Sequence, residues 1–262
     1  MKLKPLGNTD IAVSPLGLGT VKFGRNQSIK YPEQFLLPSL KELDHLVGLS
    51  YDLGINLLDT APAYGESETR LGQLLHGKRQ QWIIGSKAGE EFVDGCSHFD
   101  FSEKHLCFSV ERSLQRLKTD YLDFLLIHSD GNDVQLIENF AVFSTLEKLK
   151  QQGKIRAYGM SSKTTEGGLA TLQHAEIAMI TYNPLYTEEK PVLDFAHQHN
   201  KGILIKKAFA SGHLQQLPGE NPIQHAMNFI FQQPGATSII LGTINPNHLQ
   251  ENIQIAEELL NT

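Results

Sequence analysis

Short apolar runs alternate along the chain with longer stretches in which apolar residues recur every three or four positions. The short runs are nearly continuous in leucine, isoleucine and valine, which is typical of parallel strands buried on both faces. We therefore predict eight strands, one for each run: Leu16–Gly19, Asn56–Asp59, Trp82–Ser86, Phe124–His128, Ile155–Met160, Ala178–Tyr182, Ile203–Lys206 and Ser238–Leu241.

The longer stretches have the spacing of amphipathic helices, and they lie between the predicted strands. Ser102 before Glu103 resembles a capped helix start, and Gly153 marks a helix stop. The stretch Thr164–Leu172 fits least well, because Gly167-Gly168 lies inside its pattern and glycine disfavours a helix. The other predicted helices are Leu40–Leu53, Glu68–His76, Ser102–Leu117, Leu136–Gln151, Glu188–His199, Gln224–Gln232 and Pro246–Leu260.

Strand and helix repeated eight times over about 250 residues is the signature of an α/β fold, the (β/α)8 TIM barrel. The competing fold, a doubly wound sheet, needs a glycine-rich turn of GxGxxG spacing after its first strand. The segment Gly17–Gly24 lacks that spacing. We therefore predict a single barrel domain over residues 1–262. Leu3 to Val13 alternate weakly around the turn signal Gly7-Asn8, and we expect a hairpin there that closes the barrel bottom.

Composition narrows the classes of partner. The 262 residues, 40% of them hydrophobic and 20% charged, suffice for one large core. The net charge of −6 and the lack of a long basic block argue against nucleic acid or an anionic membrane as a partner. Without a signal-like segment or an apolar run of about 18 residues, we expect a soluble, cytoplasmic protein. Cys96 and Cys107 lack metal-finger spacing, and we predict no metal site.

Charged side chains follow or end three successive predicted strands. In a TIM barrel the active site lies at these carboxyl ends. Asp59, Lys87 and His128 are at the ends of the second, third and fourth strands, and Tyr64 follows the acid. Each has an ordinary alternative: a turn cap for the aspartate, a solvated charge for the lysine, a core position for the histidine and rim packing for the tyrosine. Because the four share one end of neighbouring strands, we predict that they form a catalytic group.

This set of side chains suits the protonation of a carbonyl oxygen. A tyrosine with an ordinary pKa near ~10 is a weak proton donor, and a neighbouring ammonium lowers that pKa. A carboxylate holds the ammonium charged and in place, and a histidine orients the carbonyl oxygen or shares its proton. Such a group protonates the oxygen while a hydride arrives at the carbon, and positioned acid catalysis contributes roughly 10²–10⁴-fold.

The motif Asn56-x-x-Asp59-Thr-Ala-x-x-Tyr64-Gly-x-Ser-Glu68 resembles the first signature of the aldo-keto reductases. The opening Leu6-Gly-Asn-Thr and Val13-Ser-Pro-Leu-Gly-Leu-Gly-Thr20 is similar to that of the family, and Ser113 to His128 resembles its second signature. Gly153 to Ser161 resembles the fifth strand with its cofactor turn, and Gly242 to Asn252 the adenosine-binding end. The resemblance therefore covers the chain from residue 3 to about residue 260, in the family's order.

The resemblance implies a (β/α)8 barrel that binds NADPH, or sometimes NADH, and reversibly reduces the aldehyde or ketone of a small molecule to an alcohol. It implies Tyr64 as general acid, Lys87 and Asp59 as the pair that tunes it, and His128 as the group that orients the carbonyl. It further implies a cofactor site that includes Gly19, Thr20, Asp59, Ser161, Ser162, Met179, Lys206, Lys207, Ser211, Gly212, Gly242, Thr243, His248, Glu251 and Asn252.

Several positions depart from the family pattern. Ser162 stands where asparagine is usual and Met179 where glutamine is often found, and neither copies the two-ended hydrogen bonding of an amide. Where an aromatic residue or arginine is usual, the chain has Lys206-Lys207, and we expect one of these lysines to contact the cofactor pyrophosphate. NADP-preferring members often have lysine at the place of Gly242 and arginine at that of His248. We expect NADPH rather than NADH to be the preferred coenzyme.

The sequence ends directly after the last predicted helix, and we expect an open, shallow substrate pocket and an exposed surface that an oligomer could cover. Three segments are expected to shape the pocket: Val21–Phe23, Gly89–Phe101 and Ser129–Val134. Phe92, Phe99 and Phe101 either line this pocket or form a cluster that pins their own loop. Trp82 lies inside a predicted strand and is expected in the core.

Two other functions compete with reduction. A Schiff-base lyase on the same barrel would use Lys87 as nucleophile, but that requires a depressed lysine pKa, and Asp59 acts in the opposite direction. A cofactor-bound sensor or accessory barrel with little turnover is the second alternative. Metal hydrolysis and serine acyl transfer fit poorly, because His197 and His199 do not share a helix face and no GxSxG motif occurs.

Overall fold

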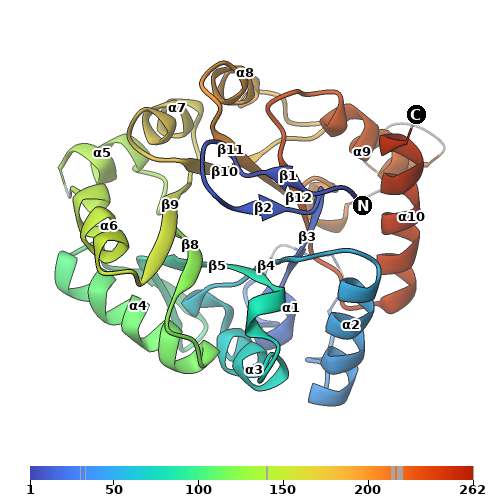
Figure 1. Cartoon of the computed structure of the whole chain (residues 1–262), viewed down its shortest axis with the longest axis horizontal. Coiled ribbons are helices and arrows are strands. Elements are labelled where there is room, and N and C mark those ends of the chain that lie inside the picture. The colour runs from blue at the N-terminus through green and yellow to red at the C-terminus, as the bar shows by residue number, and fades with distance from the viewer. Residues whose placement is uncertain (30, 33, 140, 214–215, 217–220, 262) are drawn as a thin grey trace.

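The computed structural model describes residues 1–262 except 30, 33, 140, 214–215, 217–220 and 262. Eight parallel strands close into a barrel in the order β10-β11-β12-β3-β4-β5-β8-β9, with helices around the ring of strands (Figure 1). The predicted TIM barrel is therefore confirmed. The strands are β3 (Leu16–Gly19), β4 (Leu57–Asp59), β5 (Ile83–Ala88), β8 (Leu122–His128), β9 (Ile155–Ser161), β10 (Ile177–Thr181), β11 (Gly202–Lys206) and β12 (Ser238–Leu241).

The short hairpin predicted before the first barrel strand is also present. Strands β1 (Lys4–Pro5) and β2 (Ala12–Val13) pair antiparallel, and Figure 1 shows them across one end of the strand ring. Leu6 and Ile11 are buried with side chains of the barrel interior. A Cβ at Gly7 would lie 2.3 Å from the backbone nitrogen of Gly202, so the turn of the hairpin rests directly on the start of β11. The hairpin thus closes the amino end of the barrel.

The helices surround the barrel close to their predicted ranges, with one correction. The single helix expected over Leu136–Gln151 is wrong, because the chain forms two helices with Ala141 in the left-handed region (φ 48°) at the boundary. The helices are α1 (Val21–Gly24), α2 (Leu40–Asp52), α3 (Ser67–Leu74), α4 (Glu103–Leu117), α5 (Asp133–Glu138), α6 (Val142–Gln151), α7 (Thr165–His174), α8 (Lys190–Gln198), α9 (Pro222–Phe231) and α10 (Pro246–Leu260).

Helix α7 forms despite its two adjacent glycines. Thr164 caps the helix, its hydroxyl accepting from the backbone N–H of Gly167 at 3.0 Å. A Cβ at Gly167 would lie 2.1 Å from the Asp133 side chain, and one at Gly168 would lie 2.8 Å from Val192. The glycines therefore let α7 pack closely against α5 and α8, and this packing offsets their low helix propensity.

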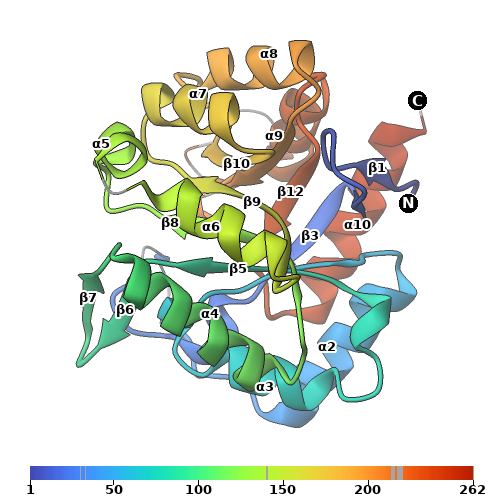
Figure 2. The same cartoon turned by 60° about the vertical axis from the view of Figure 1, so that its left-hand side comes forward.

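A second hairpin follows β5, in a segment that the sequence pattern indicated only as a loop. Strands β6 (Glu90–Val93) and β7 (Cys96–Phe99) pair antiparallel, and Figure 2 shows them as a ribbon set apart from the barrel strands. Asp94 and Gly95 at the tip both have positive φ, 52° and 80°, as a tight two-residue hairpin turn requires. This hairpin brings Glu90 to the carboxyl end of the barrel.

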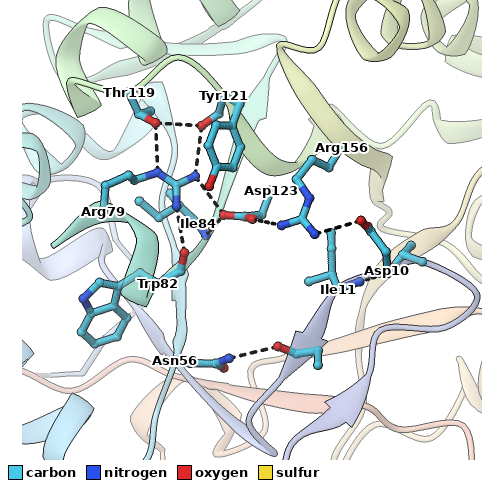
Figure 3. A network of polar contacts seen from close by, with 12 residues as sticks. Asp10, Ile11, Asn56, Arg79, Trp82, Ile84, Thr119, Tyr121, Asp123 and Arg156 are labelled. Atoms are coloured by element: carbon cyan, nitrogen blue, oxygen red, sulfur yellow. Dashed lines mark hydrogen bonds and ion pairs between the residues drawn. The ribbon is translucent and has the colours of Figure 1, made fainter.

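A network of charges around the buried Asp123 stabilises the opposite, amino end of the barrel (Figure 3). Asp123 in β8 is 1% exposed. It accepts hydrogen bonds from Arg79 (2.9 Å), from the backbone of Ile84 (2.8 Å) and from Arg156 (2.5 Å). Arg156 also pairs with Asp10 of the first hairpin at 3.1 Å. The network thereby ties β5, β8 and β9 to the segment that closes the barrel.

Within the part of the chain that the structure describes, no helix combines the length and apolarity needed to span a bilayer.

Candidate active site

A cavity of about 1080 Å³ opens at the carboxyl ends of the barrel strands. Every residue predicted as catalytic or cofactor-binding contributes to its lining. These are Gly19, Thr20, Asp59, Tyr64, Lys87, His128, Ser161, Ser162, Met179, Lys206, Lys207, Ser211, Gly212, Gly242, Thr243, His248, Glu251 and Asn252. The fold therefore gathers residues from the whole length of the chain into one place, because all parallel strands of a barrel end on the same face.

Lys87 and Asp59 form a buried ion pair between adjacent strands. The Lys87 Nζ lies 2.5 Å from Asp59 Oδ1 and also donates to the backbone oxygen of Thr60 at 3.0 Å. Burial acts to lower the pKa of Lys87, but the Asp59 carboxylate and Tyr64 outweigh it and the pKa ends above its ordinary value. Lys87 is therefore held as an ammonium, which argues against its use as a Schiff-base nucleophile.

Tyr64 lies over this ion pair at the end of a short 3-10 helix, η1 (Pro62–Tyr64). The Lys87 Nζ is 4.8 Å from the centroid of the tyrosine ring. Burial raises the pKa of Tyr64 to about 12; the ammonium of Lys87 lowers it and the carboxylate of Asp59 raises it further. From the sequence, only the lowering by lysine was expected, and burial is the larger influence. In the cavity as it stands, the phenol therefore keeps its proton at neutral pH.

His128 ends β8 beside the tyrosine. The two rings meet edge to face, with centroids 6.2 Å apart and planes at 87°. Burial lowers the pKa of His128, while Glu90, whose Oε2 lies 2.7 Å from His128 Nδ1, raises it. Burial acts to raise the pKa of Glu90, but His128 and Ser97 bring it down to about 2. Glu90 is thus an ionised member of the site that was not predicted from the sequence.

Lys206 extends from the end of β11 toward the end of β9. Its ammonium donates to Ser161 Oγ at 2.9 Å and to the backbone oxygen of Ser162 at 2.6 Å. Burial lowers the pKa of Lys206 to about 7, against the opposing influence of Glu189. The charge of Lys206 also acts to lower the pKa of His128, so both side chains belong to the same charged end of the cavity.

The family model for the aldo/keto reductases matches residues 15–218. The chain belongs to the aldo/keto reductase family. It is thus an NAD(P)-dependent oxidoreductase. A solved structure of a Pseudomonas aeruginosa protein assigned to the aldo-keto reductases is 52% identical, with a TM-score of 0.90, over 98% of this chain and 95% of that one. The holo form of an aldo-keto reductase from Bacillus halodurans is 25% identical, with a TM-score of 0.83, over 98% and 91%.

Curated relatives of this aldo/keto reductase cover it to different extents. The uncharacterized oxidoreductase YqkF of Bacillus subtilis is 28% identical over 98% of this chain and 91% of its own length. The NADH-specific methylglyoxal reductase of Escherichia coli is 31% identical over 69% of this chain and 58% of its own length. The chain thus matches about three fifths of the latter protein.

The cavity of this aldo/keto reductase fits a dinucleotide. Within the described residues, the buried Ser162 Oγ and Asn252 Oδ1 have no hydrogen-bond partner, and both residues line the cavity. Met179 is 2% exposed and packs among side chains of the barrel interior. Polar atoms without a protein partner and a cationic Lys206 are what a polar, anionic cofactor requires.

The far end of the cavity is covered by a segment that the sequence pattern did not single out. The Tyr31 hydroxyl lies 2.3 Å from where a Cβ on Gly242 would stand, and Pro32 lies 3.2 Å from one on Gly212. The Lys22 ammonium lies 3.8 Å from the centroid of the Tyr31 ring. Because the two glycines lack a Cβ, Tyr31 and Pro32 can pack closely against them at the proposed adenosine end of the site.

The expected substrate pocket needs correction. Val21, Lys22 and Glu90 line the cavity together with Arg25, but Phe23 is buried in the core and residues 129–134 are not part of the lining. The three phenylalanines also stay out of the lining. Phe92 lies under the Arg25 guanidinium (3.5 Å to the ring centroid), and Phe99 stacks on Phe101. They pin the β6–β7 hairpin, as the alternative interpretation held, because their rings pack on neighbouring side chains.

Trp82 has the core position that was predicted for it. Its side chain is 3% exposed, and its ring lies 5.5 Å from that of Tyr51.

Proposed function

We propose that this aldo/keto reductase reversibly reduces an aldehyde or ketone of a small molecule to the alcohol, with NADPH as electron donor and Tyr64 as proton donor. The observation that carries the proposal is the buried Lys87–Asp59 ion pair directly beneath the Tyr64 ring, on the cavity that His128 also lines. That the protein is a nicotinamide-dependent oxidoreductase follows from its family. The proton donor and the class of substrate are our proposal.

The four residues have separate tasks in this proposal. The bound nicotinamide supplies the hydride to the carbonyl carbon. Tyr64 gives its proton to the carbonyl oxygen, and its pKa of about 12 keeps that proton available throughout the neutral range. The Lys87 ammonium stabilises the phenolate that remains, and Asp59 holds the ammonium charged and in place. His128 orients the carbonyl oxygen.

The residues that would hold the cofactor are those predicted from the sequence. Ser161, Ser162 and Lys206 lie at the nicotinamide end, and Lys207 or Lys206 is proposed to meet the pyrophosphate. All of these residues line the cavity, and we propose that Gly242, Thr243, His248, Glu251 and Asn252 hold the adenosine end. We propose NADPH ahead of NADH, and the NADH-specific relative from Escherichia coli makes the comparison of both coenzymes essential.

The substrate is proposed to be a small carbonyl compound. Methylglyoxal is the substrate named for the Escherichia coli relative and is a rational first candidate for this chain. Its short chain suits a cavity in which Arg25, Glu90 and His128 leave a polar surface beside Tyr64.

A titration with NADPH and with NADH, followed by nicotinamide fluorescence and then by loss of absorbance on addition of 4-nitrobenzaldehyde or methylglyoxal, tests the proposal. We expect tight binding, oxidation of the coenzyme by the wild-type protein and loss of that oxidation in Tyr64→Phe. Binding without turnover would instead support a cofactor-bound sensor. No binding of either nucleotide would contradict the proposal altogether.

A further inference from the structure

The contact between Glu90 and His128 determines which ring nitrogen carries a proton. Glu90 Oε2 lies 2.7 Å from His128 Nδ1. At that distance two lone pairs would repel each other, so a proton stands on Nδ1. Among the described residues Nδ1 has no aligned hydrogen-bond partner, so the Glu90 carboxylate stabilises the Nδ1 proton by its charge at close range rather than through a linear hydrogen bond. Nε2 is the ring nitrogen left to meet a bound molecule in the cavity.

Glu90 itself is held ionised from its other side. Its Oε1 accepts a hydrogen bond from Ser97 at 2.5 Å, and Arg25 lies 3.9 Å from the same oxygen. Ser97 belongs to β7 and Arg25 follows α1. Two elements other than β8, which carries His128, therefore hold the Glu90 carboxylate in place. Burial acts to raise the pKa of Glu90, but the contacts with His128, Ser97 and Arg25 together lower it to about 2, so the carboxylate stays ionised in the neutral range.

A proton on Nδ1 has a consequence for a carbonyl substrate. In the neutral ring with this tautomer, Nε2 presents a lone pair, which repels a carbonyl oxygen because both are acceptors. Only the imidazolium, with protons on both nitrogens, donates to that oxygen.

We propose that Glu90 is a positioning residue that keeps the His128 proton on Nδ1, so that the imidazolium is the form of His128 that donates a hydrogen bond to the carbonyl oxygen. This inference rests on the carbonyl reduction proposed above. In the reduction, a bound nicotinamide would supply the hydride to the carbonyl carbon, Tyr64 gives its proton to the oxygen, and His128 keeps both of its protons. The reverse reaction therefore starts from the same imidazolium, with Tyr64 as the phenolate that takes the proton of the alcohol.

Several charges face His128 and set its titration. Glu90 from β6 favours the imidazolium, whereas Lys87 from β5 and Lys206 from β11 disfavour it, and burial disfavours it most. Tyr64 from η1 meets the ring edge to face and keeps its own proton throughout the neutral range. Asp59 partly offsets the charge of Lys87, and Arg25 partly offsets that of Glu90. Since the pKa of His128 is below its ordinary value, the rate of reduction falls as the pH increases through it.

The first test reads the tautomer directly, without turnover. Long-range proton–nitrogen NMR spectra of the cofactor-free protein distinguish Nδ1–H from Nε2–H, and His128→Asn identifies the signals of His128. We expect the neutral ring of the wild-type protein to carry its proton on Nδ1, and Glu90→Ala to move that proton to Nε2. An Nε2–H ring in the wild-type protein would overturn the proposal.

The second test uses the pH profile of kcat for reduction. Removing an opposite charge at this distance lowers a pKa by about 1–3 units, so Glu90→Gln should move the midpoint of the reduction profile down by that amount. Near neutral pH this is a loss of about tenfold for each unit. Glu91→Gln is the matched control, because Glu91 neighbours Glu90 in β6 but pairs with Arg112 and His105; its profile should stay in place.

The outcomes separate the two proposals. A Glu90→Gln variant that loses the same factor of activity at every pH, with no shift of the midpoint, would show a purely structural role and overturn the inference. A wild-type protein without turnover would instead end the proposed reduction, and the NMR measurement would still decide where the His128 proton lies.

Discussion

Each end of the barrel buries an aspartate beside cationic side chains, but the two aspartates differ in how their hydrogen bonds and charges are satisfied. At the amino end, both oxygens of Asp123 accept from the protein, one from Arg156 and the other from Arg79 and a backbone N–H. At the carboxyl end, Asp59 holds one lysine, and the charges around it border a cavity of about 1080 Å³. A network whose polar groups are all satisfied within the protein contributes to stability. A network that borders a cavity has groups that can still interact with a ligand.

The difference extends to the pKa values of the two ends. At the carboxyl end burial raises the pKa of Tyr64 to about 12 and lowers that of Lys206 to about 7. Asp123 instead lies between two guanidinium groups, which keep their charge under all ordinary conditions. The carboxyl end therefore holds the groups whose protons can take part in chemistry, and substitutions at the two ends should have separable effects.

The largest expected effect is on activity at the carboxyl end. Tyr64→Phe removes the proposed proton donor, and we expect kcat to fall by roughly 10²–10⁴-fold while the coenzyme Kd stays within about twofold. Steady-state kinetics and fluorescence titration measure these quantities. Tyr51→Phe, on the outer side of the barrel against Trp82, is the matched control and should leave kcat unchanged. Equal activity of Tyr64→Phe and wild type would remove the tyrosine from the mechanism.

The next effect is on stability at the amino end. Asp123→Asn keeps the shape of the side chain but leaves Arg79 without its carboxylate and Arg156 with Asp10 alone, and breaking such a buried pair costs about 3 kcal/mol. Urea denaturation should show this loss, while kcat per folded molecule stays within about twofold. Asp120→Asn, an exposed neighbour, should change the free energy of unfolding by less than about 0.5 kcal/mol. A large loss of kcat in Asp123→Asn would show that the two ends are not separable.

A smaller effect concerns acid stability. Because the pKa of Glu90 is depressed to about 2 from its ordinary 4.5, the stability that its ionised form contributes is fully present above pH 4.5 and is lost as the pH falls toward 2. The contribution is at most about 3 kcal/mol. Denaturation of wild type and Glu90→Gln from pH 6 to pH 3 should therefore show the difference in unfolding free energy shrinking as the pH falls. A difference that is constant with pH would contradict the assignment.

The smallest effect is expected at the hairpin. Phe99 is 39% exposed and stacks on Phe101 outside the cavity. Phe99→Ala should cost about 1 kcal/mol of stability, the size of an aromatic pair, and leave KM for any carbonyl substrate unchanged. A several-fold rise in KM would place this ring in the substrate pocket after all.

The sequence alone was enough to predict the barrel, because its strands are buried on both faces and therefore appear as continuous apolar runs. The sequence was also enough to predict that Asp59, Lys87 and His128 lie together, because the ends of parallel strands share one face of the barrel. The break between α5 and α6 was not visible, because the helical pattern continues through Ala141 while the backbone there has φ 48°.

Glu90 was missed because its role depends on a hairpin folding back over the barrel end. The signal was present in Asp94-Gly95, a dipeptide that favours a tight hairpin turn, but no pattern shows which side chain of the hairpin meets His128. The net pKa shift of Tyr64 could not be predicted either, since it depends on burial that only the folded chain defines.

The closeness of Tyr31 and Gly242 couples two positions from opposite ends of the sequence. Any side chain introduced at position 242, including a lysine meant to recruit a phosphate, has to displace the tyrosine hydroxyl first. Substitutions at these two sites will consequently be non-additive. Redesign of the coenzyme preference has to treat positions 31 and 242 as one unit, and relatives with a larger residue at 242 are expected to carry a different residue, or a different loop, at 31.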